Sequence, residues 1–515
     1  MTSNLAAARH IVETIRSLGA SDFCVCSGSR NAPLLAVLAS TPALTIRTFV
    51  DERGAAFFAL GAARRLGRPV CVVTTSGTAV AEMLPAAIEA WYSGTPLVLL
   101  TADRPARYRG TGAPQSIEQE GIFGVYAART VESWNGASAL HLNIEFDEPL
   151  IDEPVQGAQT GVSVPHQHGS DGRFVENLEA QTGVSVPHQF RSDDAARQKL
   201  PAVAIEFRRP LVLIGGLHEE ERDPVRRFAV TLNAPVYAEP LSGLREDSPL
   251  RDLLIRNERT LPRGSFDGVI RIGDIPTVRF WRDLEEKNPL PVISFSRLPF
   301  PGLTRGAVHP LSALPKVASR DRDDALMKLD AQMNERWQQV LDDEPDSELA
   351  MFRAMSLRFP ENSRVYLGNS LPVREWDLAA TRAPRGFRYG ANRGANGIDG
   401  QLSTFFGWCD EDAHNVAVVG DLTALYDLNA PWIVPQLAAD FRIVIVNNDG
   451  GRIFERVPSL RSLSDEVRSR MIENAHGLRF SAWSEMFGLA DRVEELRPDA
   501  EASRRVWQRY DELWA

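Results

Sequence analysis

VAVVGDLTALYDLNAPWIVPQLAADFRIVIVNNDGGRIF, residues 416–454, is the stretch that decides the fold of this 515-residue chain. It contains two short apolar runs, 416–419 (VAVV) and 443–446 (IVIV), with a helix-length segment between them. Each run is followed at once by polar residues and glycine. This pattern is typical of two buried parallel strands joined by a helix.

Polar side chains follow both predicted strands. Asp421 comes just after the first strand and Asn448 just after the second. The ends of parallel strands meet at one edge of a sheet, where open α/β folds bind ligands. Gly450 allows a tight turn whose carbonyl faces the same point. Three such oxygens suit Mg²⁺, although an ordinary strand–helix–strand unit with Asp and Asn at its turns has the same pattern.

Composition limits the class of protein. Hydrophobic residues make up 43% and charged residues 24% of the chain, as in globular proteins, and its length predicts about three domains. The net charge of −11 argues against a nucleic-acid partner. No apolar run is long enough for a membrane span. The four cysteines form no CxxC pair, which predicts buried free thiols and a cytoplasmic location.

Strands alternate with helices along most of the chain, which predicts an α/β fold with parallel sheets flanked by helices. Strands are expected at 23–26 and 45–50. The loop SGSRNAP at 27–33 suits an anion, and Glu52 lies at a strand-to-helix junction. The predicted order is an α/β domain at 1–155, a linker at 156–200, a central α/β domain at 201–325, a linker helix at 326–350 and a third α/β domain at 351–515.

Two segments depart from this order. The decapeptide AQTGVSVPHQ occurs at 158–167 and again at 180–189, and His166, His168 and His188 lie in or beside these copies. Their spacing matches no zinc pattern, and a duplicated surface linker is the favoured interpretation. After the segment FGLADRVEELRPDAEASRRVWQRYDELWA at 487–515 there is little room for a further helix and strand, so the last sheet is expected to lack a strand.

Several motifs together resemble one enzyme family. They are SGSRNAP (27–33), DERGAAFFALG (51–61), SGTA (76–79), ADRP (102–105), GNSLPVR (368–374), NRGANGIDG (392–400), GDLTALYDLNA (420–430) and NNDGGRIF (447–454). They resemble the 2-succinyl-5-enolpyruvyl-6-hydroxy-3-cyclohexene-1-carboxylate (SEPHCHC) synthases, thiamine diphosphate enzymes of menaquinone biosynthesis. The resemblance implies a three-domain thiamine diphosphate-binding fold and a transferase.

The resemblance also implies roles for individual residues. Glu52 would be the catalytic glutamate that activates the cofactor, and Ile398 would support the cofactor's bent shape. Cofactor contacts would come from Glu52, Ile398, Gly420, Asp421, Leu422, Asn448 and Gly450. Mg²⁺, or Mn²⁺ in its place, would be held by Asp421, Asn448 and Gly450. Substrate contacts would come from Ser29, Arg30, Arg104, Gln115, Arg279, Ser370, Arg374 and Arg393.

The implied reaction is decarboxylation of 2-oxoglutarate and conjugate addition of the resulting succinyl-semialdehyde-like carbanion to isochorismate. Both substrates carry two carboxylates, for which the planar fork of Arg is well suited. One departure weakens the match, because Val278 and Arg279 stand where some members have a Lys-Arg pair. In the family, Glu52 would serve a cofactor held by a second subunit, which implies a homodimer or a tetramer.

Two other interpretations remain open. A different thiamine diphosphate enzyme, such as a 2-oxoacid decarboxylase or an acetolactate-type synthase, would share Glu52 and the metal motif. It would need fewer arginines, because its substrates are small monocarboxylates. A catalytically silent scaffold of the same fold would need none of Glu52, Asp421 and Asn448.

Overall fold

The computed structural model describes residues 3–152, 203–286, 290–302, 306–460 and 462–515. Its contacts divide the chain into two compact units. The first comprises Met1–Ser192, Asn392–Glu411 and Tyr426–Ala439, and the second comprises Asp193–Ala391, Asp412–Leu425 and Asp440–Ala515. The duplicated decapeptide and its three histidines lie outside the described residues.

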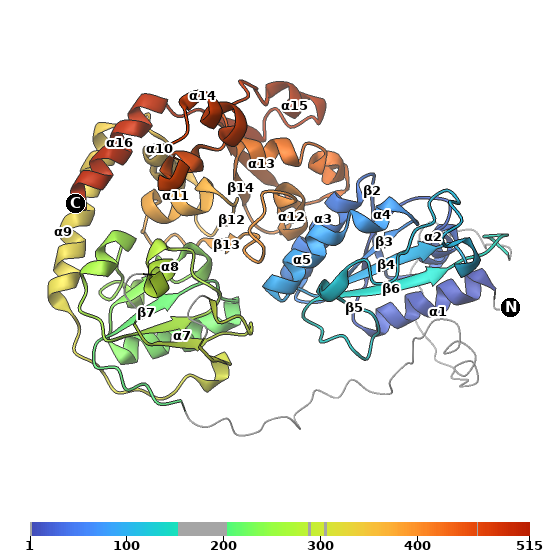
Figure 1. Ribbon diagram of the computed structural model, residues 1–515, viewed down its shortest axis with the longest axis horizontal. Helices are drawn as coiled ribbons and strands as arrows, with labels where there is room; N and C mark the ends of the chain where they lie inside the picture. The colour runs from blue at the N-terminus through green and yellow to red at the C-terminus, as the bar shows by residue number, and fades with distance from the viewer. Residues whose placement is uncertain (1–2, 153–202, 287–289, 303–305, 461) are drawn as a thin grey trace. The chain divides into compact units, whose positions relative to one another are not determined.

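The first unit is built on a parallel sheet of six strands (Figure 1). From one edge to the other they are β2 (Thr45–Phe49), β1 (Asp22–Cys26), β3 (Val70–Thr74), β4 (Leu97–Asp103), β6 (Ala139–Glu145) and β5 (Ala127–Ala128). The four central strands are almost wholly buried, because their residues are apolar on both faces. The two strands expected at 23–26 and 45–50 are therefore confirmed as β1 and β2.

Helices cover both faces of this sheet. Helices α1 (Asn4–Ser17) and α2 (Ala32–Ser40) share one core with Phe23, Val25 and Val98. Successive strand residues face opposite sides, and helix α3 (Glu52–Leu66) contacts β1 and β3. A core of this kind holds the residues at the strand ends in fixed positions.

Helix α12 (Gln401–Trp408) packs against α3, although more than 330 residues separate them in sequence. A Cβ atom on Gly61 would lie 2.0 Å from the carbonyl oxygen of Thr404, and one on Gly407 would lie 2.0 Å from that of Phe58. Only glycine therefore permits this close helix crossing. The crossing brings residues 392–411 into the same unit as Glu52.

The second unit contains two parallel sheets of five strands each. The first has the order β11 (Val308–His309), β10 (Val292–Phe295), β9 (Gly268–Ile272), β7 (Pro210–Ile214) and β8 (Val236–Ala238). Helix α7 (Glu219–Leu232) packs on one face with Val212 and Ile214, and helix α8 (Arg279–Glu286) packs on the other with Leu211 and Leu213. The sheet is thus covered on both sides, as expected for the central α/β region (Figure 1).

The other sheet has the order β13 (Arg388–Gly390), β12 (Arg364–Leu367), β14 (Asn415–Gly420), β15 (Phe441–Val446) and β16 (Val493–Leu496). The predicted parallel pair of strands is confirmed as β14 and β15, with Val416 opposite Arg442 and Gly420 opposite Val446. Helices α9 (Asp324–Asp343), α10 (Glu348–Arg358), α11 (Leu371–Ala379) and α16 (Ala500–Leu513) contribute to its core.

The expectation that the last sheet lacks its final strand is wrong. Strand β16 pairs with β15 in parallel, and helix α16 follows it. The strand has the sequence VEEL and all four residues are half-buried. A short edge strand needs no continuous apolar run, so the polar sequence of β16 did not indicate a strand.

The structure also bears on other expectations from the sequence. The predicted α/β class with parallel sheets flanked by helices is confirmed in every described sheet. Cys24, Cys26, Cys71 and Cys409 are free and buried. None of the helices in the described ranges is both long and apolar enough to cross a membrane. The helix expected within 326–350 is α9, while the domain boundaries stay predictions.

Candidate active site

Asp421 is placed by the junction of strand β14 and helix α13 (Asp421–Tyr426), of which it is the first residue. Its side chain is buried. The backbone N–H of Leu422 donates to Oδ1 at 2.7 Å, and the backbone N–H of Gly450 donates to Oδ2 at 2.8 Å. Burial raises the pKa of Asp421, and these two hydrogen bonds oppose the rise. The turn after β15 is thereby tied to the end of β14.

Asn448 lies in that turn, two residues after β15. Its Nδ2 donates to both carboxylate oxygens of Glu348, at 2.9 and 3.1 Å. The amide nitrogen is therefore occupied, and the amide oxygen is the atom that remains to bind a cation. Burial raises the pKa of Glu348 to about 7, while hydrogen bonding to Asn448 lowers it.

Gly450 adopts a φ of +118°, and a Cβ atom there would lie 2.4 Å from the carbonyl oxygen of Glu473. Only glycine fits this turn. Its own carbonyl accepts from the N–H of Arg452 at 2.9 Å and keeps a second lone pair. His476, which the sequence did not single out, places Nε2 3.2 Å from Oδ2 of Asp421.

The oxygen atoms of Asp421, Asn448 and Gly450 suit a hard divalent cation. A carboxylate has about four lone-pair sites, so Asp421 retains acceptor capacity after its contacts with Leu422, Gly450 and His476. With the Asn448 amide oxygen and the Gly450 carbonyl, it forms the all-oxygen set that Mg²⁺ prefers. Apart from the residues next to Gly420 in the chain, no described atom lies within 4 Å of a Cβ built on it. The end of β14 thus has open space beside Asp421 and Leu422, as a bound diphosphate would require.

Glu52 is the first residue of α3 in the first unit. The N-terminus of α3 is capped by Asp51, which accepts from the N–H groups of Arg53 and Gly54 at 3.1 Å. Glu52 is consequently not needed as the cap. Burial raises its pKa, and the charges of Asp51 and Glu82 add to the rise.

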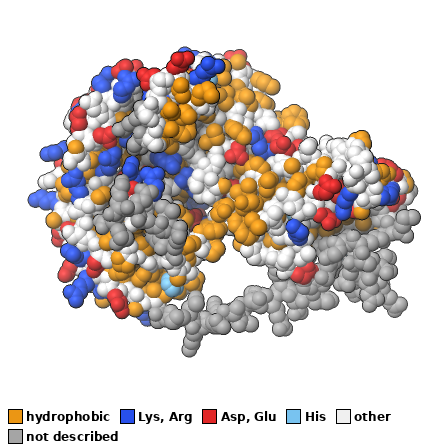
Figure 2. Space-filling view, viewed as in Figure 1, with side chains coloured by type: hydrophobic (Ala, Val, Ile, Leu, Met, Phe, Trp, Pro, Cys, Tyr) orange, Lys and Arg blue, Asp and Glu red, His pale blue; other side chains and the backbone are white. Residues whose placement is uncertain are grey.

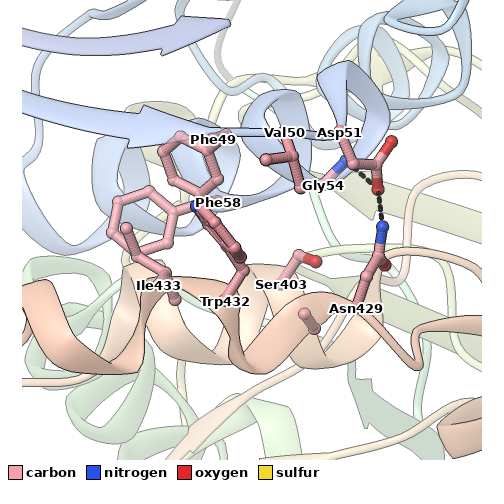
Figure 3. A pocket seen from close by; sticks show the side chains of 10 residues that line it. Phe49, Val50, Asp51, Gly54, Phe58, Ser403, Asn429, Trp432 and Ile433 are labelled. Atoms are coloured by element: carbon pink, nitrogen blue, oxygen red, sulfur yellow. Dashed lines mark hydrogen bonds between the residues drawn. The ribbon is translucent and has the colours of Figure 1, made fainter.

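A small pocket lies beside this helix start (Figure 3). Aromatic and aliphatic side chains line one part of it, including Phe49, Phe58 and Trp432. At the other end, Nδ2 of Asn429 donates to Oδ2 of Asp51 at 2.9 Å. Residues next to Glu52 are therefore fixed by the segment around residues 429–433 as well as by their own helix.

The loop that carries Arg393 and Ile398 is held by Glu89 of helix α5 (Leu84–Ser93). The N–H groups of Gly394 and Ala395 donate to its carboxylate at 2.9 and 2.7 Å. The guanidinium of Arg64 donates to the same carboxylate at 2.9 Å. No sequence pattern indicated Glu89, because its partners lie about 305 residues further along the chain.

Asp427 is a second acidic residue whose carboxylate accepts hydrogen bonds from backbone N–H groups near this loop. It is buried and accepts from the N–H groups of Gly400 and Leu402, both at 3.0 Å, at the start of α12. Burial raises its pKa to about 6, and the charge of Arg53 opposes this. The residue belongs to the GDLTALYDLNA motif, which was the signal available for it.

Loss of the Glu89 carboxylate should destabilise the first unit. Glu89→Gln leaves Arg64 and two backbone N–H groups with one poorer acceptor in a buried site. We expect a loss of about 1–3 kcal/mol in the free energy of unfolding, measured by denaturant titration. The exposed Glu118 offers a control, since Glu118→Gln should change stability by less than about 0.5 kcal/mol. Equal stability of the two variants would contradict the assigned contact.

Four of the substrate residues predicted in the first unit lie in loops that follow strands β1 and β4. Ser29 is exposed in the loop after β1, whereas Arg30 is buried, donates to the carbonyl of Phe146 at 2.9 Å and lies 3.3 Å from Glu148. Arg104 follows β4, and its Nε donates to the carbonyl of Pro114 at 2.8 Å.

Gln115 follows Pro114 directly, so the chain brings Arg104 and Gln115 together. Gln115 has a φ of +54° and its Nε2 donates to the carbonyl of Ser76 at 3.4 Å. Gln119, which the sequence did not single out, accepts from the N–H of Gly77 at 2.9 Å and is fully buried. This loop is thereby attached to the SGTA turn.

The substrate residues predicted in the second unit are exposed or half-buried. Ser370 precedes α11 with a φ of +71°, and Arg374 donates to its carbonyl at 2.6 Å. Arg374 is exposed overall, but partial desolvation lowers its pKa, and the charges of Glu239 and Glu258 oppose this. Glu258 also accepts from the N–H of Arg279 at 2.8 Å.

Val278 is the residue that departs from the Lys-Arg pair implied by the resemblance. Its side chain is 7% exposed and belongs to the core around β7 and α8. An apolar residue suits that environment. The neighbouring Arg279 is exposed and contacts Asp283 at 3.3 Å.

Comparison with known proteins gives consistent results. The family described as "Thiamine pyrophosphate enzyme, N-terminal TPP binding domain" matches residues 5–122. The 2-succinyl-5-enolpyruvyl-6-hydroxy-3-cyclohexene-1-carboxylate synthase of Bdellovibrio bacteriovorus is 39% identical, with 99% of each chain covered. The synthase of the same name from Akkermansia muciniphila is 38% identical over 92% of this chain and 88% of its own, and that from Halobacterium salinarum is 31% identical over 95% and 91%. The chain therefore belongs to the thiamine diphosphate-dependent 2-succinyl-5-enolpyruvyl-6-hydroxy-3-cyclohexene-1-carboxylate synthase family.

Proposed function

We propose that this chain decarboxylates 2-oxoglutarate and adds the remaining four-carbon unit to isochorismate, with thiamine diphosphate as cofactor. The observation that carries the proposal is the buried Asp421 bound to the Gly450 turn, with Asn448 oriented by its amide nitrogen. The name and near full-length match of the Bdellovibrio relative support the same activity. When bound, thiamine diphosphate supplies the electron sink for decarboxylation.

The residues of the chain bind and orient the reactants. Asp421, Asn448 and the Gly450 carbonyl would hold Mg²⁺, or Mn²⁺ in its place, and through it the diphosphate. Glu52 would hold a proton at the pyrimidine nitrogen of the cofactor, and burial raises its pKa, which favours the protonated form. Ile398 would support the cofactor from the loop that Glu89 fixes.

Arginines would bind the dicarboxylate substrates. Arg104 and Gln115 come from one loop system, and Ser370 and Arg374 from the start of α11. Ser29, Arg30, Arg279 and Arg393 complete the proposed set. Val278 is an apolar core residue, so of the neighbours Val278 and Arg279 it is Arg279 that can offer a charge to the substrate.

We also propose that the active unit is a homodimer, alone or paired into a tetramer, with each active site at the subunit interface. In the first unit, Val50 and Trp432 are 61% and 48% exposed near Glu52. In the second unit, hydrophobic side chains gather around α14 (Asp465–Val467) and α15 (Ser481–Met486) (Figure 2). Exposed apolar patches support a protein interface, and the four buried free thiols support a cytoplasmic location.

Consumption of both substrates tests the proposed reaction. Purified protein with thiamine diphosphate and Mg²⁺ should remove 2-oxoglutarate and isochorismate in equal amounts, followed by isochorismate absorbance and by CO₂ release. Loss of 2-oxoglutarate alone, indifferent to isochorismate, would indicate a decarboxylase instead. Cofactor binding without any reaction would indicate a non-catalytic member of the fold.

A further inference from the structure

Glu348 has a contact that its place in the helix does not explain. It is the first residue of α10, and the N-terminus of that helix is already capped by Ser347, whose side chain accepts from the N–H of Ala350. The Glu348 side chain is buried and faces Asn448, 100 residues further along the chain. A buried acid is costly unless it has a partner, and the Asn448 amide provides two hydrogen bonds.

The geometry of the pair fixes the direction of the Asn448 amide. Both N–H bonds of Nδ2 are directed at the two Glu348 oxygens, at 2.9 and 3.1 Å. A flipped amide would place Oδ1 against the same carboxylate, where two acceptors face each other. The carboxylate therefore selects the rotamer in which Oδ1 is free.

A second buried acid, Glu375, lies near Glu348. Glu375 of α11 is 1% exposed and lies close enough to Glu348 for the two charges to interact. Burial, together with the charge of Glu348, raises the pKa of Glu375 well above its usual value.

We propose that Glu348 is a positioning residue for the cation site: it holds the Asn448 amide so that its oxygen faces Mg²⁺. This rests on the proposed function, because Asn448 is assigned there as a metal ligand. Partners of this kind orient metal ligands, and their loss typically weakens metal binding by about 10- to 100-fold.

Exchanging the carboxylate at position 348 with the amide at position 448 tests the proposal. Glu348→Gln removes one acceptor and allows the Asn448 amide to flip, while Asn448→Asp places a second carboxylate against Glu348. The double variant, Glu348→Gln with Asn448→Asp, restores one amide donor facing one carboxylate acceptor in the reverse order. A cycle of the two single variants and the double variant isolates the coupling between the positions.

Mn²⁺ binding in the presence of thiamine diphosphate, followed by the electron paramagnetic resonance signal of free Mn²⁺, is the readout. We expect Glu348→Gln to bind Mn²⁺ about 10- to 100-fold more weakly than the parent, and the double variant to recover at least part of that loss. Thermal unfolding without cofactor shows whether each variant folds. Added Mn²⁺ and thiamine diphosphate should then raise the midpoint less in Glu348→Gln than in the parent.

Glu495 provides a matched control. It accepts from Nδ2 of Asn447 at 2.7 Å and from the N–H of Phe480 at 2.9 Å, so it forms the same kind of pair with the adjacent asparagine. Glu495→Gln should leave Mn²⁺ affinity within about twofold of the parent. Parent-like affinity in Glu348→Gln, or an equal loss in Glu495→Gln, would overturn the role of Glu348 alone. A parent that binds no Mn²⁺ with thiamine diphosphate would overturn the proposed function and this inference together.

Discussion

Glu52→Gln should reduce turnover by about 10²- to 10⁴-fold, the usual contribution of a positioned acid–base group. Glutamine fills the same space, so the cofactor should still bind. Its amide cannot exchange a proton with the pyrimidine nitrogen, so activation of the cofactor should fail. Steady-state rates with 2-oxoglutarate and isochorismate measure the first effect, and quenching of tryptophan fluorescence by thiamine diphosphate measures the second.

Glu82 supplies the control for this substitution. It is exposed, and its charge contributes to the raised pKa of Glu52. Glu82→Gln removes a nearby carboxylate without touching the proposed proton path, so the plateau turnover should stay at the parent level. Equal turnover in Glu52→Gln and the parent would remove Glu52 from the mechanism, and the start of α3 would then need only its Asp51 cap.

The fold was predictable where a strand is buried on both faces, because such a strand appears in the sequence as a continuous apolar run. Strands β14 and β15 are buried along most of their length, so their apolar runs stand out, and parallel pairing then places Asp421 beside the turn containing Asn448 and Gly450. Strand β16 was missed because half-buried edge residues tolerate two glutamates.

The supporting contacts could not be predicted for a different reason. Glu348 contacts Asn448, and Glu89 contacts residues 394 and 395, across separations of 100 and about 305 residues. Sequence periodicity describes neighbours along one helix or strand, and it contains no information on which helix start faces which loop. Tyr426–Ala439 shows the same limit, because it joins the first unit although it lies between β14 and β15.

Asp421→Asn should weaken Mn²⁺ binding on the order of a hundredfold or more, because ligand charge sets the affinity for hard cations. Asparagine keeps the shape and can still accept from the N–H of Leu422, but it removes the one charged group among the three proposed ligands. Turnover should fall in parallel at limiting metal. Electron paramagnetic resonance titration and steady-state rates check the two effects, and unchanged affinity would exclude Asp421 as a ligand.

Mixing Asp421→Asn with Glu52→Gln tests whether the two residues serve one site from different subunits. In a homodimer of the proposed kind, a mixed dimer has one site with both residues intact and one site with neither. Random reassociation of the two inactive variants should then restore about one quarter of the parent activity, since half of the dimers are mixed and each has one working site. If both residues came from the same subunit, every site in the mixture would carry one defect and no activity would return. Recovery therefore establishes that a cofactor held at Asp421 is activated by Glu52 of the partner subunit, and its absence places the whole site within one chain.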